Sequence, residues 1–152
     1  MSARRSSATI KHMTMTATAR RRGDTLEHQV DVNGRHLLVT DEPERLGGTD
    51  HGPAPHELLP ATLAACAATT VAMYARRRGW DIGEIAVEAD YDPDSTPRRV
   101  ALELRLPDDL TTEQRRRLER VAEACPARRA LEAGFVFAEQ PDSVGAEGPC
   151  AG

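Results

Sequence analysis

The sequence predicts an α+β fold, in which antiparallel strands accompany one long apolar helix. Several short segments alternate apolar and polar residues with a period of two, which indicates half-buried strands. One stretch, residues 55–78, is rich in Ala and holds no charged residue between positions 58 and 75. Strands dominate the first third of the chain and helices the last third, which is the segregated order of an α+β domain.

The N-terminal part predicts three strands. The first covers residues 14–19, and the second and third cover residues 25–32 and 36–40. Asn33-Gly34 separates the last two, and this pair suits a two-residue hairpin because both residues tolerate positive φ. We therefore expect an antiparallel hairpin here.

A long loop and a long helix follow. Residues 41–55 are rich in Gly and Pro, and a loop of this length in a small domain usually has a function. The helix runs from about residue 55 to 78, and Gly79 ends it. Its own side chains are small and apolar on nearly every face, so we expect most faces of the helix to be buried. A membrane span is disfavoured because the helix contains Pro60, three threonines and many alanines.

The second half predicts a strand pair and a final strand. Residues 84–91 and 99–106 alternate, and the turn-rich segment 92–97 joins them as an antiparallel pair. Residues 135–139 are predicted to form the last strand. The tail 141–152 is rich in Gly and Pro and is predicted to be disordered.

Two short helices lie between these strands. Thr111 and Gln114 form a capping box that opens the first. Cys125-Pro126 begins the second, because Pro suits the first helical position, and this helix runs to Ala133.

The composition predicts one folded domain that assembles as a dimer. Apolar residues make up 39% and charged residues 29% of the 152 positions, so residues 13–140 suffice for one domain behind a disordered leader at 1–12. The chain has only two Phe, two Tyr and one Trp, so Ala, Leu and Val must form the core. Such a core buries little area, and we expect a partner subunit, hence a homodimer, to complete it.

Other classes of function are disfavoured. Arginines bunch at 20–22, 76–78 and 115–117, but the net charge is −4 and no nucleic-acid motif is present, so solvated helix ends and faces explain them better. The cysteine spacing suggests no metal site. The N-terminus lacks the apolar run of a secretory signal, and we expect a cytoplasmic protein that binds neither nucleic acid nor membrane.

Two cysteines carry the candidate chemistry. Cys66 lies inside the long helix, and a lone helical Cys is usually structural because free Cys is among the most buried residue types. Cys125 stands at a helix start, where free N–H groups and the helix dipole favour a thiolate, and Arg128-Arg129 add positive potential. Cys150 lies in the tail, where we expect no role.

Three motifs together resemble the OsmC/Ohr family of hydroperoxide reductases (osmotically induced protein C and organic hydroperoxide resistance proteins), and its OsmC-like branch in particular. They are Gly52-Pro53-Ala54-Pro55-His56-Glu57-Leu58-Leu59, Ala64-Ala65-Cys66 and Ala124-Cys125-Pro126. The resemblance covers roughly residues 14–140. It implies an intertwined homodimer with antiparallel sheets wrapped around long central helices.

The resemblance also implies a thiol peroxidase of the antioxidant stress response. In that chemistry, Cys66 attacks a peroxide and becomes a sulfenic acid, Cys125 condenses with it to a disulfide, and an external dithiol reduces the disulfide. No metal or organic cofactor is required. An apolar pocket would favour organic hydroperoxides over hydrogen peroxide.

A cation is needed at this site, because burial disfavours the thiolate form of Cys66. In the family an Arg supplies it and a Glu orients that Arg. Arg45 matches the place of the OsmC-type arginine, whereas Ohr-type members use an earlier strand-turn, where residues 20–22 lie. The alternative for Arg45 is a solvated loop residue.

The acidic residue is where the sequence departs from the family pattern. Peroxidatic members carry it ten positions before the helical Cys, a position that is His56 here, while Glu57 stands nine before. On an unbroken helix, nine residues turn about 180° and ten leave about 80°, so Glu57 would point away from Cys66. Pro60 or a partner subunit could bring Glu57 to the site. Otherwise His56 assists Cys66, or the site is not an efficient peroxidase.

Three hypotheses about the function therefore stay open. Besides the peroxidase, the chain could be a non-peroxidatic OsmC-like protein that binds a small thiol or acyl ligand in the same cavity. A structural protein with two inert thiols is the third. Glu57 has its own alternative, since an acidic residue in a first helical turn stabilises the helix anyway.

Overall fold

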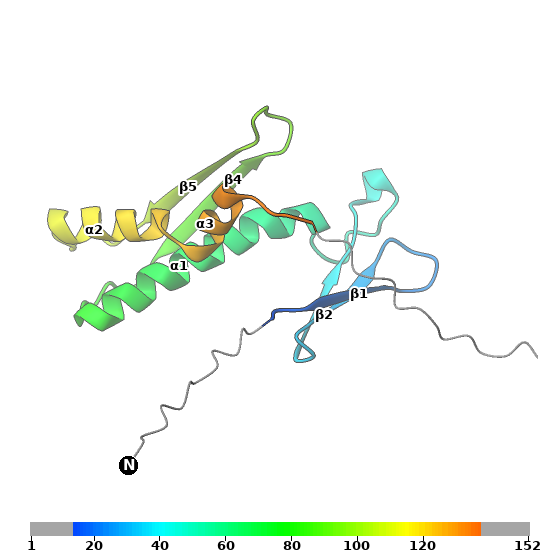
Figure 1. The fold of residues 1–152 in the computed structure, drawn as a ribbon, viewed down its shortest axis with the longest axis horizontal. Coiled ribbons are helices and arrows are strands. Elements are labelled where there is room, and N and C mark those ends of the chain that lie inside the picture. Colours follow the sequence, from blue (N-terminus) through cyan, green and yellow to red (C-terminus); the bar gives the residue numbers. More distant parts are fainter. Residues whose placement is uncertain (1–13, 138–152) are drawn as a thin grey trace, which may run out of the picture. The chain divides into compact units, whose positions relative to one another are not determined.

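The computed structural model describes residues 14–137, which form two compact units divided after Ala61 (Figure 1). The predicted leader 1–12, the predicted tail 141–152 and Cys150 lie outside the described residues. The mixture of antiparallel sheet and helix confirms the α+β class, and its longest element is the predicted long helix.

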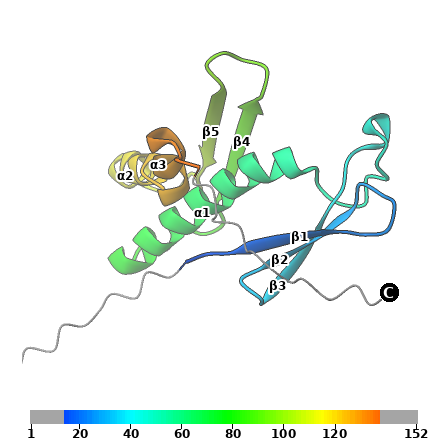
Figure 2. The same ribbon diagram turned by 45° about the vertical axis from the view of Figure 1, so that its right-hand side comes forward.

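The N-terminal unit is built on a three-stranded antiparallel meander, with strand order β1-β2-β3 (Figure 2). Its strands are β1 (Ala17–Arg21), β2 (His28–Val32) and β3 (His36–Thr40). Asn33 and Gly34 have φ angles of 57° and 65°, as the hairpin prediction requires. The first two strands start three residues later than predicted. For β2 the reason is the turn before it, where the Thr25 hydroxyl donates to the Arg22 carbonyl.

The loop after β3 is shaped by close backbone contacts. It contains two short 3-10 helices, η1 (Glu44–Leu46) and η2 (Pro55–Glu57). At Gly48 an added Cβ would lie 1.7 Å from the Glu42 carbonyl oxygen, so only glycine fits there.

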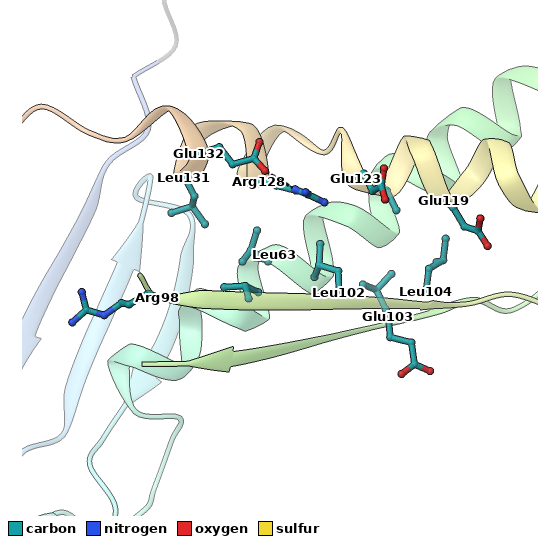
Figure 3. A pocket seen from close by; sticks show the side chains of 13 residues that line it. Leu63, Arg98, Leu102, Glu103, Leu104, Glu119, Glu123, Arg128, Leu131 and Glu132 are labelled. Atoms are coloured by element: carbon teal, nitrogen blue, oxygen red, sulfur yellow. Dashed lines mark hydrogen bonds and ion pairs between the residues drawn. The ribbon is translucent and has the colours of Figure 1, made fainter. Parts of the chain in front are cut away.

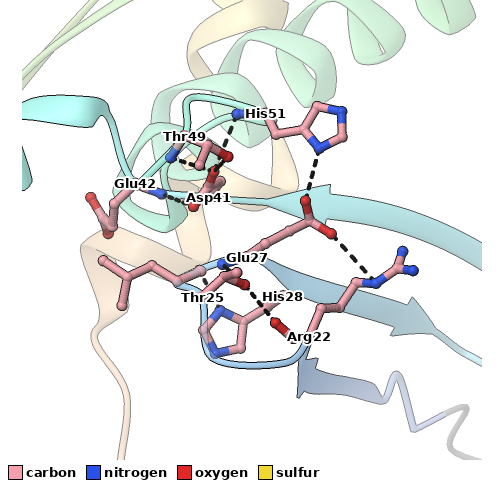
Figure 4. Close-up of polar contacts among 9 residues, drawn as sticks. Arg22, Thr25, Glu27, His28, Asp41, Glu42, Thr49 and His51 are labelled. Atoms are coloured by element: carbon pink, nitrogen blue, oxygen red, sulfur yellow. Dashed lines mark hydrogen bonds and ion pairs between the residues drawn. The ribbon is translucent and has the colours of Figure 1, made fainter. Parts of the chain in front are cut away.

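Asp41 ties this loop together, as Figure 4 shows. Its carboxylate accepts hydrogen bonds from the Thr49 hydroxyl at 2.6 Å and from the backbone N–H groups of Glu42, Thr49 and His51. The Thr49 hydroxyl is the largest cause that lowers the pKa of Asp41 from 3.8 to about 2, although burial opposes the shift. Thr40 and Asp41 are the buried polar residues of the described chain, and the described residues 14–61 contain no buried apolar side chain.

The second unit is organised around the long helix. The helix α1 (Leu58–Arg78) follows η2 directly and ends at Gly79, whose φ is 67°. The remaining elements are β4 (Ala86–Asp92), β5 (Arg99–Arg105), α2 (Thr112–Glu123) and α3 (Pro126–Ala133). The strands β4 and β5 form the predicted antiparallel pair, with Ala89 opposite Leu102.

One ridge of α1 forms the core of this unit. Ala67, Val71 and Ala75 recur at four-residue spacing, so they share one face of the helix and are all buried. Leu118 and Ala122 of α2 pack against this ridge. Ile82 and Cys125 complete the buried cluster.

The helix starts follow the predicted local chemistry. The Thr111 hydroxyl accepts from the Gln114 N–H at 3.2 Å, and the Gln114 side chain accepts in return from the Thr111 N–H at 2.9 Å. Cys125 is the N-cap of α3, Pro126 is its first residue and Gly134 ends it at φ 76°. Both short helices are therefore confirmed.

The predicted final strand is wrong for its described part. Residues 135–137 form no strand, and Phe135, Val136 and Phe137 are 62%, 97% and 93% exposed. A strand requires a neighbouring backbone to bond, and these residues have none within the described chain. Residues 138 and 139 of the predicted strand lie outside the described residues.

The long helix is buried on one face rather than on most faces. Outside its buried ridge, α1 exposes a row of mainly small side chains: Ala61, Ala65, Thr69, Ala72 and Met73. By length and composition the segment Pro55–Arg78 could cross a membrane, and 22% of its most apolar window is buried. Core helices pass the same test, so this finding is weak evidence for a membrane span.

Candidate functional site

The second unit brings Cys66 and Cys125 together. Cys66 lies on α1 and Cys125 is the N-cap of α3, 59 positions later, and both are free thiols. Both sulfurs accept backbone N–H groups from residues 127 and 128 at the start of α3, so the two thiols are neighbours. Cys66 and Cys125, which the family resemblance implies to be a reactive pair, thus lie near each other in one unit.

The N-terminus of α3 donates one N–H group to each sulfur. The Ala127 N–H donates to the Cys66 Sγ, and the Arg128 N–H donates to the Cys125 Sγ, both at 3.4 Å. Pro126 has no N–H, so these are the first two donors of the helix. The sequence pattern placed this helix end at Cys125, and it missed the contact with Cys66 because only tertiary packing creates it.

Cys125 is a protonated thiol at neutral pH. Burial is the largest cause that raises its pKa above 9.0, and the neighbouring Cys66 adds to the rise. The N–H groups of Arg128 and Ala127 oppose the rise without cancelling it. The helix start does favour the thiolate of Cys125, as expected, but burial of the thiol has the larger and opposite effect.

The two sulfurs differ in access to solvent. Cys125 is 0% exposed, whereas Cys66 is partly exposed. Cys66 is therefore the more accessible of the two cysteines within the described chain. The Arg128 guanidinium donates to Glu132 at 2.8 Å, and that hydrogen bond, with a smaller electrostatic effect of Cys125, raises the pKa of Arg128.

Arg45, His56 and Glu57 belong to the N-terminal unit. Arg45 lies in η1, and its side chain forms no hydrogen bond or ion pair with any residue between 14 and 137. The Glu57 carboxylate accepts from the Ala54 N–H at 2.8 Å, so it caps η2, as the alternative for this residue predicted. His56 is the middle residue of η2.

The premise of an unbroken helix from residue 55 is wrong. The segment begins as the 3-10 helix η2, and α-helical geometry starts only at Leu58. A 3-10 helix turns more per residue than an α-helix, so the angles expected between Cys66 and residues 56 and 57 do not apply. Pro60 fits within the first turn of α1, where it disrupts no hydrogen bond.

A second arginine of the N-terminal unit is held by a carboxylate, and Figure 4 shows this arrangement. The Glu27 carboxylate lies 3.5 Å from the Arg22 Nε and 2.8 Å from the His51 Nδ1. The arginines at 20–22 were predicted from the sequence as candidates, but Glu27 was not. Its position across the β1–β2 turn from Arg22 is the signal that could have found it.

A cavity of about 670 Å³ opens in the second unit, between α1, α2, α3 and the β4–β5 pair (Figure 3). Its apolar lining is Leu63, Val87, Val100, Leu102, Leu104, Ala122 and Leu131, and its charged lining is Arg98, Glu103, Glu119, Glu123, Arg128 and Glu132. Neither cysteine lines it, although Leu63 lies one helical turn before Cys66. Within residues 14–137 no cluster of His, Cys, Asp and Glu could hold a metal ion.

The fold and the paired thiols define a two-cysteine protein, with one Cys on a long helix and the other at the N-cap of a later helix. The chain belongs to the OsmC-like protein family, whose model matches residues 48–139. This match confirms the resemblance inferred from the motifs. No curated protein sequence matches the chain.

Solved structures of this family share the fold. A candidate osmotic stress induced and detoxification response protein of Psychrobacter arcticus 273-4 is 24% identical with a TM-score of 0.65, over 80% of this chain and 90% of that one. The organic hydroperoxide resistance protein OsmC of Legionella pneumophila is 24% identical with a TM-score of 0.59, over 79% and 90%. A candidate organic hydroperoxide resistance protein of Vibrio cholerae, with captopril bound in one of its active sites, is 22% identical with a TM-score of 0.59, over 84% and 90%.

Proposed function

We propose that this protein is a thiol-dependent peroxidase that reduces organic hydroperoxides. The observation that carries the proposal is the shared N-terminus of α3, which donates one N–H to each of the two adjacent sulfurs. A reactive pair needs two thiols within bonding reach and a source of positive potential at the attacking sulfur. Membership of a family that includes organic hydroperoxide resistance proteins supports the substrate class.

Cys66 is the attacking residue. It is the more exposed sulfur, and the Ala127 N–H stabilises negative charge on it. The Cys66 thiolate attacks the distal oxygen of the hydroperoxide, so that an S–O bond forms and the O–O bond breaks. The alkoxide leaves and takes a proton from water, and Cys66 becomes a sulfenic acid.

Cys125 is the resolving residue. Its raised pKa keeps it a neutral thiol, so it does not compete for the peroxide. Its sulfur attacks the Cys66 sulfur, an S–S bond forms, and the sulfenic oxygen leaves as water with the thiol proton. An external dithiol then attacks the more exposed Cys66 sulfur, releases Cys125 as a thiol, and closes its own disulfide by displacing Cys66.

Arg45 is our proposed cation for the Cys66 thiolate. Its guanidinium has no carboxylate partner among the described residues, so its charge is available. Arg22 is the second candidate because Glu27 holds it, which matches the Arg and Glu pair of the family. Glu57 acts through the cap it provides to η2, and His56, beside it, is a site neighbour.

The active form is proposed to be a homodimer. The exposed row of small side chains on α1 and the exposed apolar residues 135–137 are surfaces that a second subunit would cover. The N-terminal unit also has no buried apolar side chain among its described residues. A partner sheet or helix would supply that cover, and a cytoplasmic location stays a prediction from the sequence.

Peroxide turnover tests the proposed function. With a dithiol in excess, the purified protein should reduce cumene hydroperoxide faster than hydrogen peroxide. Cys66→Ser should lower turnover by at least about a hundredfold, because a hydroxyl replaces the nucleophile. Cys125→Ser should still form a sulfenic acid that dimedone traps, but it should not form the intramolecular disulfide. Absence of both turnover and a dimedone adduct at Cys66 would remove the peroxidase.

A small-molecule binding protein is the second candidate function, and the cavity of about 670 Å³ favours it. Its volume suits a small organic ligand, and its lining combines seven apolar with six charged residues. Four Glu and two Arg line it, so a neutral or cationic ligand fits better than an anion. The captopril bound in the Vibrio cholerae protein is a precedent within the fold. Ligand-induced thermal stabilisation that survives Cys66→Ser, without any turnover, would favour this function.

A further inference from the structure

Tyr74 holds two arginine side chains from two helices. The Arg117 Nε of α2 donates to the Tyr74 hydroxyl at 2.8 Å, and the Arg78 Nε of α1 donates to the same oxygen at 3.2 Å. Both guanidinium carbons lie over the Tyr74 ring, 5.7 and 5.4 Å from its centroid. Because both Nε atoms bond one oxygen, they lie no more than about 6 Å apart.

The terminal N–H groups of both guanidinium groups have no hydrogen-bond partner among the described residues. Each uses its Nε, and neither forms any other side-chain hydrogen bond or ion pair with residues 14–137. Glu113 lies one helical turn before Arg117 on α2, yet it pairs with neither arginine. Two adjacent positive charges therefore present terminal N–H donors with no carboxylate between them.

Joining α1 to α2 does not account for this arrangement. One hydrogen bond, from Arg117 to Tyr74, already links the two helices. The addition of Arg78 brings a second cation close to the first, which costs free energy unless an anion lies near both. The hydrogen bond from Arg117, with the one from Arg78, also lowers the pKa of Tyr74, which shows that the phenol experiences both charges.

We propose that Arg78 and Arg117, positioned by Tyr74, form a binding site for a phosphate group. A phosphate bears several acceptor oxygens and can take N–H groups from two guanidinium groups at once, and the spacing of the two Nε atoms allows such bridging. All three residues lie in the second unit, in elements α1 and α2. The site is independent of the thiol chemistry, so either can fail without the other.

Trp80 supplies a local probe. It is the one tryptophan in the chain, and its ring packs edge-on to Tyr74 with centroids 5.8 Å apart. Pyrophosphate is titrated into the full-length protein at constant ionic strength while Trp80 fluorescence is recorded, with chloride as the reference salt. A saturable change is expected with pyrophosphate and not with chloride.

Substitutions test whether Arg78, Arg117 and Tyr74 form the binding site. Arg117→Gln and Arg78→Gln should each weaken pyrophosphate binding about tenfold, and Arg117→Lys should weaken it severalfold because it keeps the charge but loses the planar fork. Arg120→Gln, which removes an exposed charge of the same helix, is the matched control and should leave binding within about twofold. Tyr74→Phe keeps the aromatic ring but frees both guanidinium groups, and it should also weaken binding.

Two further measurements complete the test. The Tyr91→Phe variant leaves Tyr74 as the one tyrosine of the chain. Saturation of this variant with pyrophosphate should raise the pKa of Tyr74, because a bound anion opposes the phenolate. This measurement requires no substitution of Arg78 or Arg117. Vesicles that contain phosphatidic acid distinguish a lipid phosphate from a soluble one, provided that binding depends on Arg117. The proposal is overturned if neither pyrophosphate nor the vesicles bind saturably, or if Arg120→Gln weakens binding as much as Arg117→Gln.

Discussion

Different interactions stabilise each of the two units. The N-terminal unit is a sheet and loop in which the buried side chains among residues 14–61 are Thr40 and Asp41. The second unit has an apolar core in which Val71, Leu118 and Cys125 are fully buried. Hydrogen bonds set the shape of the first unit, and burial of apolar surface sets that of the second.

The residues of the proposed chemistry are divided between these two units. The thiols lie in the unit with the apolar core, where Cys125 is buried and Cys66 packs against the same cluster. The candidate cations Arg45 and Arg22 lie in the polar unit, on a loop and at a strand end. The unit with the sulfurs should therefore be sensitive to loss of packing, and the unit with the cations to loss of hydrogen bonds and to acid.

The largest effect on stability is expected from Leu118→Ala. Leu118 is 0% exposed, so its truncation leaves a cavity in the core and should lower the free energy of unfolding by about 2–5 kcal/mol. Leu37→Ala, in the sheet of the other unit, is the matched control, since Leu37 is 63% exposed and should cost less than about 0.5 kcal/mol. Urea unfolding measures both, and equal losses would contradict the contrast between the units.

The next effect tests whether the N-terminal unit contributes to catalysis. Arg45→Gln should lower kcat/KM for cumene hydroperoxide by about tenfold or more, because loss of a cation destabilises the Cys66 thiolate. Arg22→Gln is the control and should have the smaller effect. The reverse order would transfer the role of cation to Arg22, and no effect from either would restrict the chemistry to the second unit.

Thiol reactivity should differ between the two cysteines. At pH 8, iodoacetamide should alkylate Cys66 in the Cys125→Ser variant at least about tenfold faster than Cys125 in the Cys66→Ser variant, because Cys125 is buried and its pKa is raised. Burial of the neutral thiol also stabilises the fold below pH 9, and this contribution is lost as the pH rises through the raised pKa. Mass spectrometry of the alkylated peptides gives both rates.

The smallest effect is expected at the Asp41 loop and should remain local. Asp41→Asn should speed amide exchange at Thr49 and His51 by about fivefold, because the amide accepts these N–H groups less strongly than the carboxylate. The lowered pKa of Asp41 means that its contribution to stability is present above pH 3.8 and is lost as the pH falls towards 2. Nuclear magnetic resonance should show this exchange change without a change at Leu118.

Local sequence rules predicted most of the elements. The hairpin turn at Asn33-Gly34, the capping box at Thr111 and the start of α3 at Pro126 all depend on residues within a few positions of one another. The strand predicted at residues 135–139 failed over its described part because a strand depends on a distant backbone, and no local pattern shows whether one is present. The predicted burial of α1 on most faces likewise depends on contacts with a partner subunit, which no local pattern shows.

The sequence by itself determined the family, the element order and the identity of the two cysteines, because motifs and periodicity are properties of neighbouring residues. Only the tertiary structure decided that the Ala127 N–H reaches Cys66 across 61 positions, and that burial rather than the helix end governs the pKa of Cys125. It also joined Arg78 and Arg117 at Tyr74. These results depend on contacts between elements distant along the chain, and packing of the whole unit determines such contacts.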